Sequence, residues 1–212
     1  MKTQRQINWL EALQPLFKKY RGKKHPLTHE NRYQLVVKVI LSARDSDKHI
    51  NEIAPALFKE YPSIKELATA KSDDLYPFIG SVTNFANKAA WLVELAKTLG
   101  EDKYIPKNLE GLTALPGIGR KSANVIMSES GDEMEGVIVD LHVLRVAPRL
   151  GIAKGANPEK IEKQLMEKIP QKYWKPLGMS LTYLGRELCR PTNPRCPECP
   201  MNPVCEYYQK QK

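Results

Sequence analysis

The sequence predicts an all-α protein, and three observations carry this prediction. Apolar residues recur every three or four positions along most of the chain, which is the period of a helix. No pair of segments has the pattern of a β-hairpin or of a strand–helix–strand unit. Residues that start and stop helices fall between the apolar stretches, so that about ten helices are expected.

The N-terminal part of the chain is expected to hold two helical segments joined by a polar connector. The first carries an apolar stripe that Pro15 should kink or divide; the stripe consists of Ile7, Leu10, Leu13, Phe17 and Tyr20. Residues 21–30 form the basic connector. Residues 35–41 are rich in β-branched side chains, which favours a strand. Because no partner strand lies nearby, a buried helix is the preferred interpretation.

Amphipathic helices are expected on both sides of a loop at residues 80–87. One helix covers residues 50–58, and the next is short and starts at a capping-box pattern formed by Ser63 and Glu66. Apolar spacing returns over residues 88–99 after the loop.

Helix starts are also visible in the C-terminal part of the chain. A short apolar run leads to Asp140, which would cap the helix that follows it. Asn157 and Pro158 have the pattern of a cap and a first-turn proline. A last amphipathic helix leads into a group of cysteines; its apolar stripe is Trp174, Leu177, Leu181, Leu184 and Leu188.

A short turn between two helical stretches stands at the centre of these elements and reads Leu115-Pro116-Gly117-Ile118-Gly119-Arg120-Lys121. Pro116 should stop the first helix, and the two glycines let the backbone turn tightly. The turn aims free N–H groups at the start of the second helix, where the helix dipole also favours an anion. In a basic protein the natural anion is a DNA phosphate. Gly117, Gly119 and Arg120 are therefore predicted DNA-binding residues.

The composition agrees with a nucleic-acid partner. The 212 residues contain 33 Lys and Arg against 24 Asp and Glu, which leaves a net charge of +9. This balance favours a polyanion, with nucleic acid first and an anionic membrane surface second. No apolar run approaches the ~18 residues of a membrane-spanning helix, and the N-terminus has no signal-peptide core. A soluble, cytoplasmic protein associated with DNA is expected, with no membrane contact.

All the cysteines lie near the C-terminus, where Cys189, Cys196, Cys199 and Cys205 have the spacing C-x6-C-x2-C-x5-C. Thiolates this close in sequence can surround one metal centre, either an iron–sulfur cluster or a tetrahedral zinc ion. Structural zinc usually shows two C-x2-C pairs, whereas only one pair here has that spacing, which tilts the metal toward iron–sulfur. Arg190 and Arg195 lie between the first two cysteines and either contact DNA or solvate the loop.

The central turn, Asp140 and the cysteine spacing together resemble endonuclease III, the iron–sulfur branch of the helix-hairpin-helix DNA glycosylases. The resemblance runs from about Tyr33 to Cys205. It is carried by Leu41-Ser42-Ala43 with Asp47 and Asn51, the central turn with Ala123-Asn124-Val125, Val139-Asp140 with His142 and Arg145-Val146, Gly185-Arg186, and the four cysteines. The hairpin alone occurs in many DNA-binding proteins, but these features in this order are highly specific.

The resemblance implies two helical domains. A six-helix barrel domain would cover residues 29–135, with the helix-hairpin-helix at about residues 108–128. Residues 1–28 and 136–212 would form a second domain, in which the four cysteines hold a 4Fe-4S cluster. The implied partner is double-stranded DNA that contains a damaged base or an abasic site, bound by a monomer.

The resemblance also implies the roles of two catalytic residues, Lys121 and Asp140. Lys121 would attack the sugar C1′ of an extruded nucleotide, expel the base and form a Schiff base, after which β-elimination nicks the strand. Only the neutral amine is a nucleophile, so burial or nearby cations would have to lower its pKa. Asp140 would accept a proton or stabilise positive charge on the sugar. Relatives that do not cut the strand carry Ser or Tyr in place of the lysine, so Lys121 favours the strand-cutting mode.

Three positions depart from the family's usual pattern, and all three concern damage recognition. Arg44 replaces a Gln on the segment that fills the gap left by the flipped nucleotide, and is a predicted DNA contact. The wedge loop is lengthened to residues 80–85, in which Val82 and Phe85 either insert into the duplex or belong to the core. Leu141 replaces the Thr that usually follows the aspartate, which removes a hydroxyl near the carboxylate.

The leading hypothesis is a base-excision repair enzyme that removes oxidised pyrimidines and cleaves the abasic strand. Two alternatives stay open. One is a mismatch or alkylated-base glycosylase with a different pocket, and the other is a non-catalytic DNA-binding or redox-sensing module.

Overall fold

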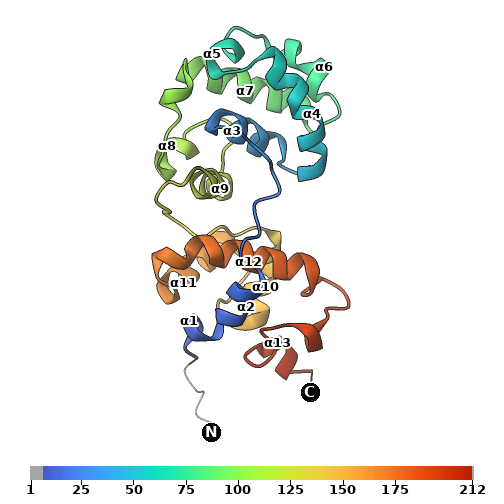
Figure 1. The fold of residues 1–212 in the computed structure, drawn as a ribbon, viewed down its shortest axis with the longest axis vertical. Coiled ribbons are helices and arrows are strands. Elements are labelled where there is room, and N and C mark those ends of the chain that lie inside the picture. The colour runs from blue at the N-terminus through green and yellow to red at the C-terminus, as the bar shows by residue number, and fades with distance from the viewer. Residues whose placement is uncertain (1–6, 212) are drawn as a thin grey trace. The chain divides into compact units, whose positions relative to one another are not determined.

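The computed structural model describes residues 7–211, and within these residues all regular secondary structure is helical (Figure 1). The all-α prediction is confirmed. The chain forms two compact units. Residues His25–Glu135 make the middle unit, whereas the residues up to Lys24 and those from Gly136 onward make the terminal unit. Within residues 7–211, no helix has the length and apolar character to cross a membrane.

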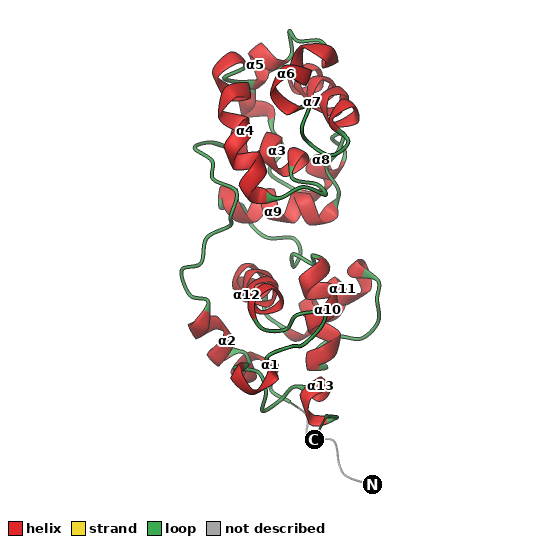
Figure 2. Cartoon of the chain, turned by 90° about the vertical axis from the view of Figure 1, so that its right-hand side faces the viewer, coloured by secondary structure: helices red, strands yellow, loops and turns green. Residues whose placement is uncertain are grey.

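The middle unit is built around α3. Its elements are α3 (Arg32–Leu41), α4 (Asp47–Glu60), α5 (Ile64–Leu67), η1 (Ser72–Leu75), α6 (Tyr76–Ile79), α7 (Phe85–Leu99), η2 (Asp102–Tyr104), α8 (Leu109–Thr113) and α9 (Arg120–Ser130). Residues Leu35–Leu41 of α3 are all buried; six of the seven are apolar, and the seventh, Lys38, donates from its amine to the carbonyl of Thr28 at 2.7 Å. Figure 2 shows α3 enclosed by the other helices of this unit. The interpretation of residues 35–41 as a buried helix is therefore confirmed.

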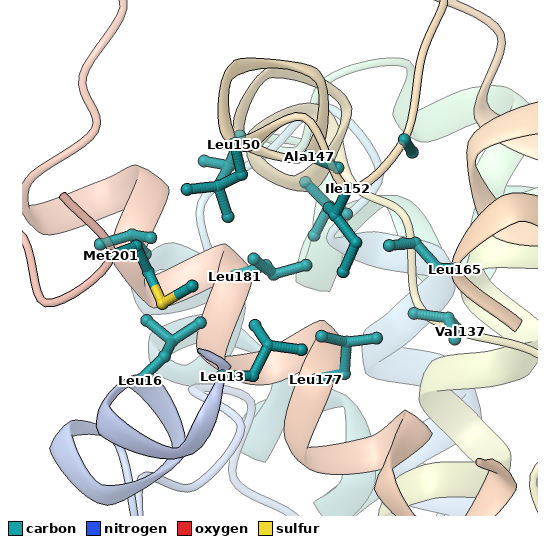
Figure 3. Packing of buried hydrophobic residues seen from close by; sticks show 14 of the residues in the cluster. Leu13, Leu16, Val137, Ala147, Leu150, Ile152, Leu165, Leu177, Leu181 and Met201 are labelled. Carbon is teal, nitrogen blue, oxygen red and sulfur yellow. The ribbon is translucent and has the colours of Figure 1, made fainter. Parts of the chain in front are cut away.

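The terminal unit joins both ends of the chain in one core. Its elements are α1 (Trp9–Ala12), α2 (Gln14–Lys19), α10 (Leu141–Leu150), α11 (Pro158–Lys168), η3 (Gln171–Tyr173), α12 (Trp174–Glu187), η4 (Cys196–Glu198) and α13 (Glu206–Gln209). Leu13 and Leu16 from the N-terminal segment pack with Leu177, Leu181 and Met201 in a single buried cluster (Figure 3). This burial of apolar surface explains why the two termini share one folded body.

Close contact between α10 and α12 depends on Gly185. A Cβ at this position would lie 2.7 Å from the Cβ of His142, which is too close, and 3.2 Å from Cγ2 of Val146, which is tight. Glycine thus lets the two helix backbones approach each other. This approach fixes the position of the side chains that α12 presents toward the start of α10.

Two expectations about helix boundaries and one about the number of helices need correction. The segment expected as a loop over residues 80–87 ends earlier, because α7 starts at Phe85, where Asn84 takes a left-handed conformation and the Phe85 ring packs edge-on against Tyr76. The helix before the central turn ends at Thr113, ahead of Pro116. Residues 7–211 contain thirteen α-helices instead of about ten. The excess arises from the break at Pro15, which is confirmed, and from single-turn helices such as α6.

Candidate functional site

The central turn joins α8 to α9, and one side of it packs against the middle unit. Gly117 has φ +77°, and a Cβ there would lie 2.8 Å from the Trp91 ring. Ile118, the next residue, is buried. Gly119 has extended backbone and caps α9, and a Cβ built on it meets no atom within 4 Å. The turn is therefore fixed against Trp91 on one side and open on the other, so an anion can approach the backbone N–H groups at the start of α9.

Lys121 lies in the first turn of α9, as predicted, and its side chain is exposed. The helix is anchored by a buried run from Ala123 to Ser128. The neighbouring Arg120 is also exposed. The structure thus presents an accessible amine, on a rigid helix, beside the open side of the turn.

The two glycines of the turn give a matched pair of substitutions. Gly117→Ala is expected to lower the free energy of unfolding by about 2–4 kcal/mol, because the added Cβ is strained at positive φ and clashes with Trp91. Gly119→Ala should cost less than about 1 kcal/mol, since its surroundings are open. Thermal unfolding followed by circular dichroism measures both. Equal losses for the two variants would contradict this description of the turn.

Asp140 is the N-cap of α10, which confirms the prediction of its structural role. Its Oδ1 accepts hydrogen bonds from the backbone N–H groups of His142 and Val143, both at 2.8 Å. Its Oδ2 accepts a hydrogen bond from the hydroxyl of Thr182 at 3.0 Å. Lys121 belongs to the middle unit and Asp140 to the terminal unit.

Thr182 brings a hydroxyl to the carboxylate that the residue after Asp140 does not supply. Leu141 has no hydroxyl, and the one that contacts Oδ2 comes from α12. The Leu141 side chain points outward and is 78% exposed. Sequence reasoning could not find this contact because Thr182 follows Asp140 by 42 positions along the chain.

Arg44 lies at a sharp bend directly after α3 and has a left-handed backbone with φ 59°. The buried amine of Lys88 donates to the carbonyl oxygens of Leu41 and Ala43, at 2.8 and 2.6 Å, and so holds the bend in place. Burial lowers the pKa of Lys88. The Arg44 side chain itself is exposed and available to a partner. Lys88 was not identified from the sequence, where it reads as one more polar position of a helix.

The bend at Arg44 is tied to the loop over residues 80–84. Asp45 accepts hydrogen bonds from the backbone N–H of Thr83 at 3.1 Å and from the ring of His49 at 2.8 Å, and the other ring nitrogen of His49 lies 3.0 Å from the Ser81 hydroxyl. Burial acts to raise the pKa of Asp45, but its hydrogen bonds outweigh burial and hold the pKa below its usual value. These hydrogen bonds fix the bend at Arg44 and the loop over residues 80–84 to each other.

Of the two wedge candidates, Val82 is buried, with 2% of its surface exposed, and serves the core. Phe85 is half-buried against Tyr76. The exposed residues of the loop are polar, namely Ser81, Thr83 and Asn84. Of the two roles expected for Val82, the structure therefore supports the core residue and not the wedge, because its apolar side chain turns inward.

All four cysteines line one cavity in the terminal unit, whose free volume is about 20 Å³. Apolar side chains, including Leu150, Leu184 and Leu188, form the rest of its wall. Burial raises the pKa of Cys199 to about 11, and it also raises the pKa of Cys196 and of Cys205. Among residues 7–211, no three His, Cys, Asp or Glu side chains are grouped tightly enough to share a single ion. Four sulfur donors around one cavity are the ligand set of an iron–sulfur cluster, whose positive charge would stabilise the thiolates.

Two arginines on α10 hold in place the loop between Cys189 and Cys196, here called the cysteine loop. Arg149 donates to the carbonyl oxygens of Arg190 and Pro191, at 2.7 and 3.1 Å, and lies 3.6 Å from the Cys189 sulfur. Arg145 donates to the carbonyl of Cys189 at 3.0 Å. In the sequence, Arg145 and Arg149 are four positions apart on the helix that Asp140 caps. This spacing was the only sign that both could contact the same loop, and Arg149 was not identified from it.

The two loop arginines predicted to bind DNA have different surroundings. Arg190 is exposed. Arg195 is also exposed but pairs with Glu198, through a hydrogen bond of 2.7 Å from Nε to the carboxylate. The carboxylate partly neutralises Arg195, so Arg190 is the freer of the two to meet a phosphate.

Comparison with known proteins agrees with these features. Residues 37–171 match the family model of the HhH-GPD superfamily base excision DNA repair proteins. The fold and the open turn before α9 are therefore those of a base-excision repair protein. Endonuclease III of Synechocystis is 36% identical over 92% of this chain and 90% of its own. The chain belongs to the endonuclease III family and is a DNA glycosylase of base excision repair.

Solved structures place the chain in the same family. A non-covalent endonuclease III–DNA complex matches with a TM-score of 0.87 and 30% identity, covering 97% of this chain and 98% of that one. A thermostable thymine-DNA glycosylase matches with a TM-score of 0.81 over 96% of this chain and 97% of that one, at 21% identity. The second match reflects a shared fold, so the fold by itself does not select the damaged base.

Proposed function

We propose that this enzyme removes oxidised pyrimidines from double-stranded DNA and then cleaves the abasic strand through a Schiff base on Lys121. The observation that carries the proposal is the exposed amine of Lys121, held in the first turn of α9 beside the open turn at Gly119. A nucleophile at this place can reach the sugar of a nucleotide whose phosphates rest on the turn.

Lys121 supplies the electrons for the first step. Its neutral Nζ attacks C1′ of the extruded nucleotide, and the bond from C1′ to the base breaks, so that the base leaves with that electron pair and takes up a proton. The sugar ring then opens and a protonated Schiff base forms between C1′ and Nζ. Loss of a proton from C2′ expels the 3′ phosphate, which is β-elimination. Water finally releases Lys121.

Asp140 serves the charge and proton transfers of this sequence. As an ionised carboxylate it stabilises positive charge that develops on the sugar, or it accepts the proton that Nζ loses on attack. The N-cap hydrogen bonds support this role, because they fix the carboxylate at the start of α10.

The DNA backbone is bound through the turn and the exposed arginines. The N–H groups near Gly117 and Gly119 meet a phosphate, and Arg120 adds charge beside them. Arg44 meets the orphaned base or a phosphate, and Arg190 and Arg195 contact the backbone from the cysteine loop. The enzyme works as a monomer on duplex DNA that contains a damaged base or an abasic site.

Cys189, Cys196, Cys199 and Cys205 hold a 4Fe-4S cluster in this proposal. Bound there, the cluster would hold the loop between the first two cysteines in one shape. Two observations support the proposal: all four cysteines line one cavity in the terminal unit, and their spacing C-x6-C-x2-C-x5-C favours an iron–sulfur cluster over zinc.

A panel of lesion duplexes tests the substrate. Duplexes carrying one thymine glycol, one G·T mismatch, one alkylated purine or one abasic site are incubated with the cluster-loaded protein, with Lys121→Ala as the control. We expect excision and strand cleavage at thymine glycol and cleavage at the abasic site. Excision at the mismatch or alkylated base alone would support the alternative specificity. Binding without any product would support a non-catalytic module.

DNA affinity should weaken steeply with salt. Because phosphate contacts release counterions, we expect the dissociation constant for an abasic duplex to rise at least about tenfold between about 50 and about 200 mM salt. Fluorescence anisotropy of the duplex measures this change. An affinity independent of salt over that range would contradict the proposed phosphate contacts.

A further inference from the structure

The hydrogen bonds that residues 7–211 make to Asp140 leave one acceptor position open, and that position is on Oδ2. A carboxylate has about four lone-pair sites, two on each oxygen. The N–H groups of His142 and Val143 occupy both sites of Oδ1, whereas the Thr182 hydroxyl occupies one site of Oδ2. The oxygen that remains able to accept a proton is therefore the oxygen that Thr182 contacts.

The cap alone does not fix that oxygen. A carboxylate held only through Oδ1 can still turn about its Cβ–Cγ bond, because this torsion has broad minima. The hydrogen bond from Thr182 is the second attachment, and two attachments define the plane of the group. Thr182 is itself 7% exposed and lies on α12, where Gly185 lets that helix pack closely on α10. Its position is thus set by the core and not by solvent.

We propose that Thr182 is a positioning residue for Asp140, which orients Oδ2 toward the reacting sugar and stabilises the ionised carboxylate. The inference rests on the proposed function of Asp140. It also accounts for Leu141, because the hydroxyl missing from the residue after the aspartate is supplied from α12. A hydrogen bond to the charged form favours that form, so losing the hydroxyl should make Asp140 easier to protonate.

Other groups near this end of α10 must be separated from Asp140. His142 lies beside it and interacts with Asp140, with Arg145 on the same helix and with Arg186 on α12. Burial lowers the pKa of His142. The titration of His142 can therefore contribute to a pH profile of activity. For this reason, one of the tests must measure the pKa of Asp140 itself.

The first test compares Thr182→Val with Thr182→Ser in single-turnover excision across pH. Valine keeps the shape and removes the hydroxyl, whereas serine keeps the hydroxyl. We expect the acid limb of the valine profile to move up by about one pH unit, and the serine profile to follow the wild type. A valine profile that superimposes on the wild type would overturn the proposal. Equal shifts in both variants would also overturn it, because serine keeps the hydroxyl and the loss of the hydroxyl would then not be the cause.

The second test does not depend on activity. Protein labelled with ¹³C at the aspartate carboxyl carbon is titrated by NMR, and the Asp140 signal is assigned by its absence in Asp140→Asn. The pKa read from that signal should be about one unit higher in Thr182→Val than in the wild type. An unchanged pKa would overturn the inference. If the wild type cuts neither lesion nor abasic DNA, the proposed function fails, while this titration still decides whether Thr182 holds Asp140.

Discussion

Lys121→Ala is expected to abolish strand cleavage at abasic sites, with a fall in rate of at least about 10³-fold, because no other group replaces a covalent nucleophile. The protein should stay folded, since the Lys121 side chain is exposed and the anchoring run Ala123–Ser128 is untouched. Single-turnover cleavage of an abasic duplex by gel electrophoresis measures the rate.

Lys121→Arg is the matched control for charge. Arginine keeps a cation beside the turn but is always protonated and forms no Schiff base. It should bind the abasic duplex about as tightly as the wild type while cleaving no faster than the alanine variant. Lys97→Ala, on the exposed face of α7, controls for the loss of a surface lysine and should leave cleavage unchanged. Substantial cleavage by Lys121→Arg would mean that the lysine acts only through its charge.

Asp140→Asn is expected to lower the rate of base excision by about 10²–10⁴-fold, because an amide neither accepts a proton nor stabilises positive charge as a carboxylate does. Asparagine caps helices about as well as aspartate, so the hydrogen bonds to His142 and Val143 should persist and the melting temperature should change little. Single-turnover excision from a thymine glycol duplex measures the effect.

Asp140→Ala separates the two roles of this residue. It should lose activity to the same extent and in addition lose about 1 kcal/mol of stability, because the N-cap of α10 is removed. If Asp140→Asn excised bases at the wild-type rate while Asp140→Ala was inactive, Asp140 would serve only as a cap, and its catalytic role would be wrong.

Local patterns in the sequence were sufficient for features made by neighbouring residues. Asp140 and Asn157 cap their helices, Pro15 divides the first helical stretch, and Gly117 takes the positive φ that the turn requires. Each of these depends on residues within one helical turn, where the chain itself fixes which atoms meet.

Contacts between distant segments could not be predicted in this way. The hydrogen bond from Lys88 to Leu41 spans 47 positions, and the contact between Arg149 and Cys189 spans 40. In the sequence, both side chains are polar positions of a helix with no visible partner. The inward turn of Val82 depends equally on tertiary packing, because an apolar residue in a loop reads the same whether it faces the core or the solvent.

The central claim is that Lys121 forms the covalent link to DNA, and the site of that link can be measured directly. The cluster-loaded wild-type protein is incubated with an abasic duplex in the presence of borohydride, digested, and mapped by mass spectrometry. We expect one reduced adduct, on the Nζ of Lys121. An adduct on another lysine or on the N-terminal amine would contradict the assignment, and the absence of any adduct would contradict the Schiff-base mechanism itself.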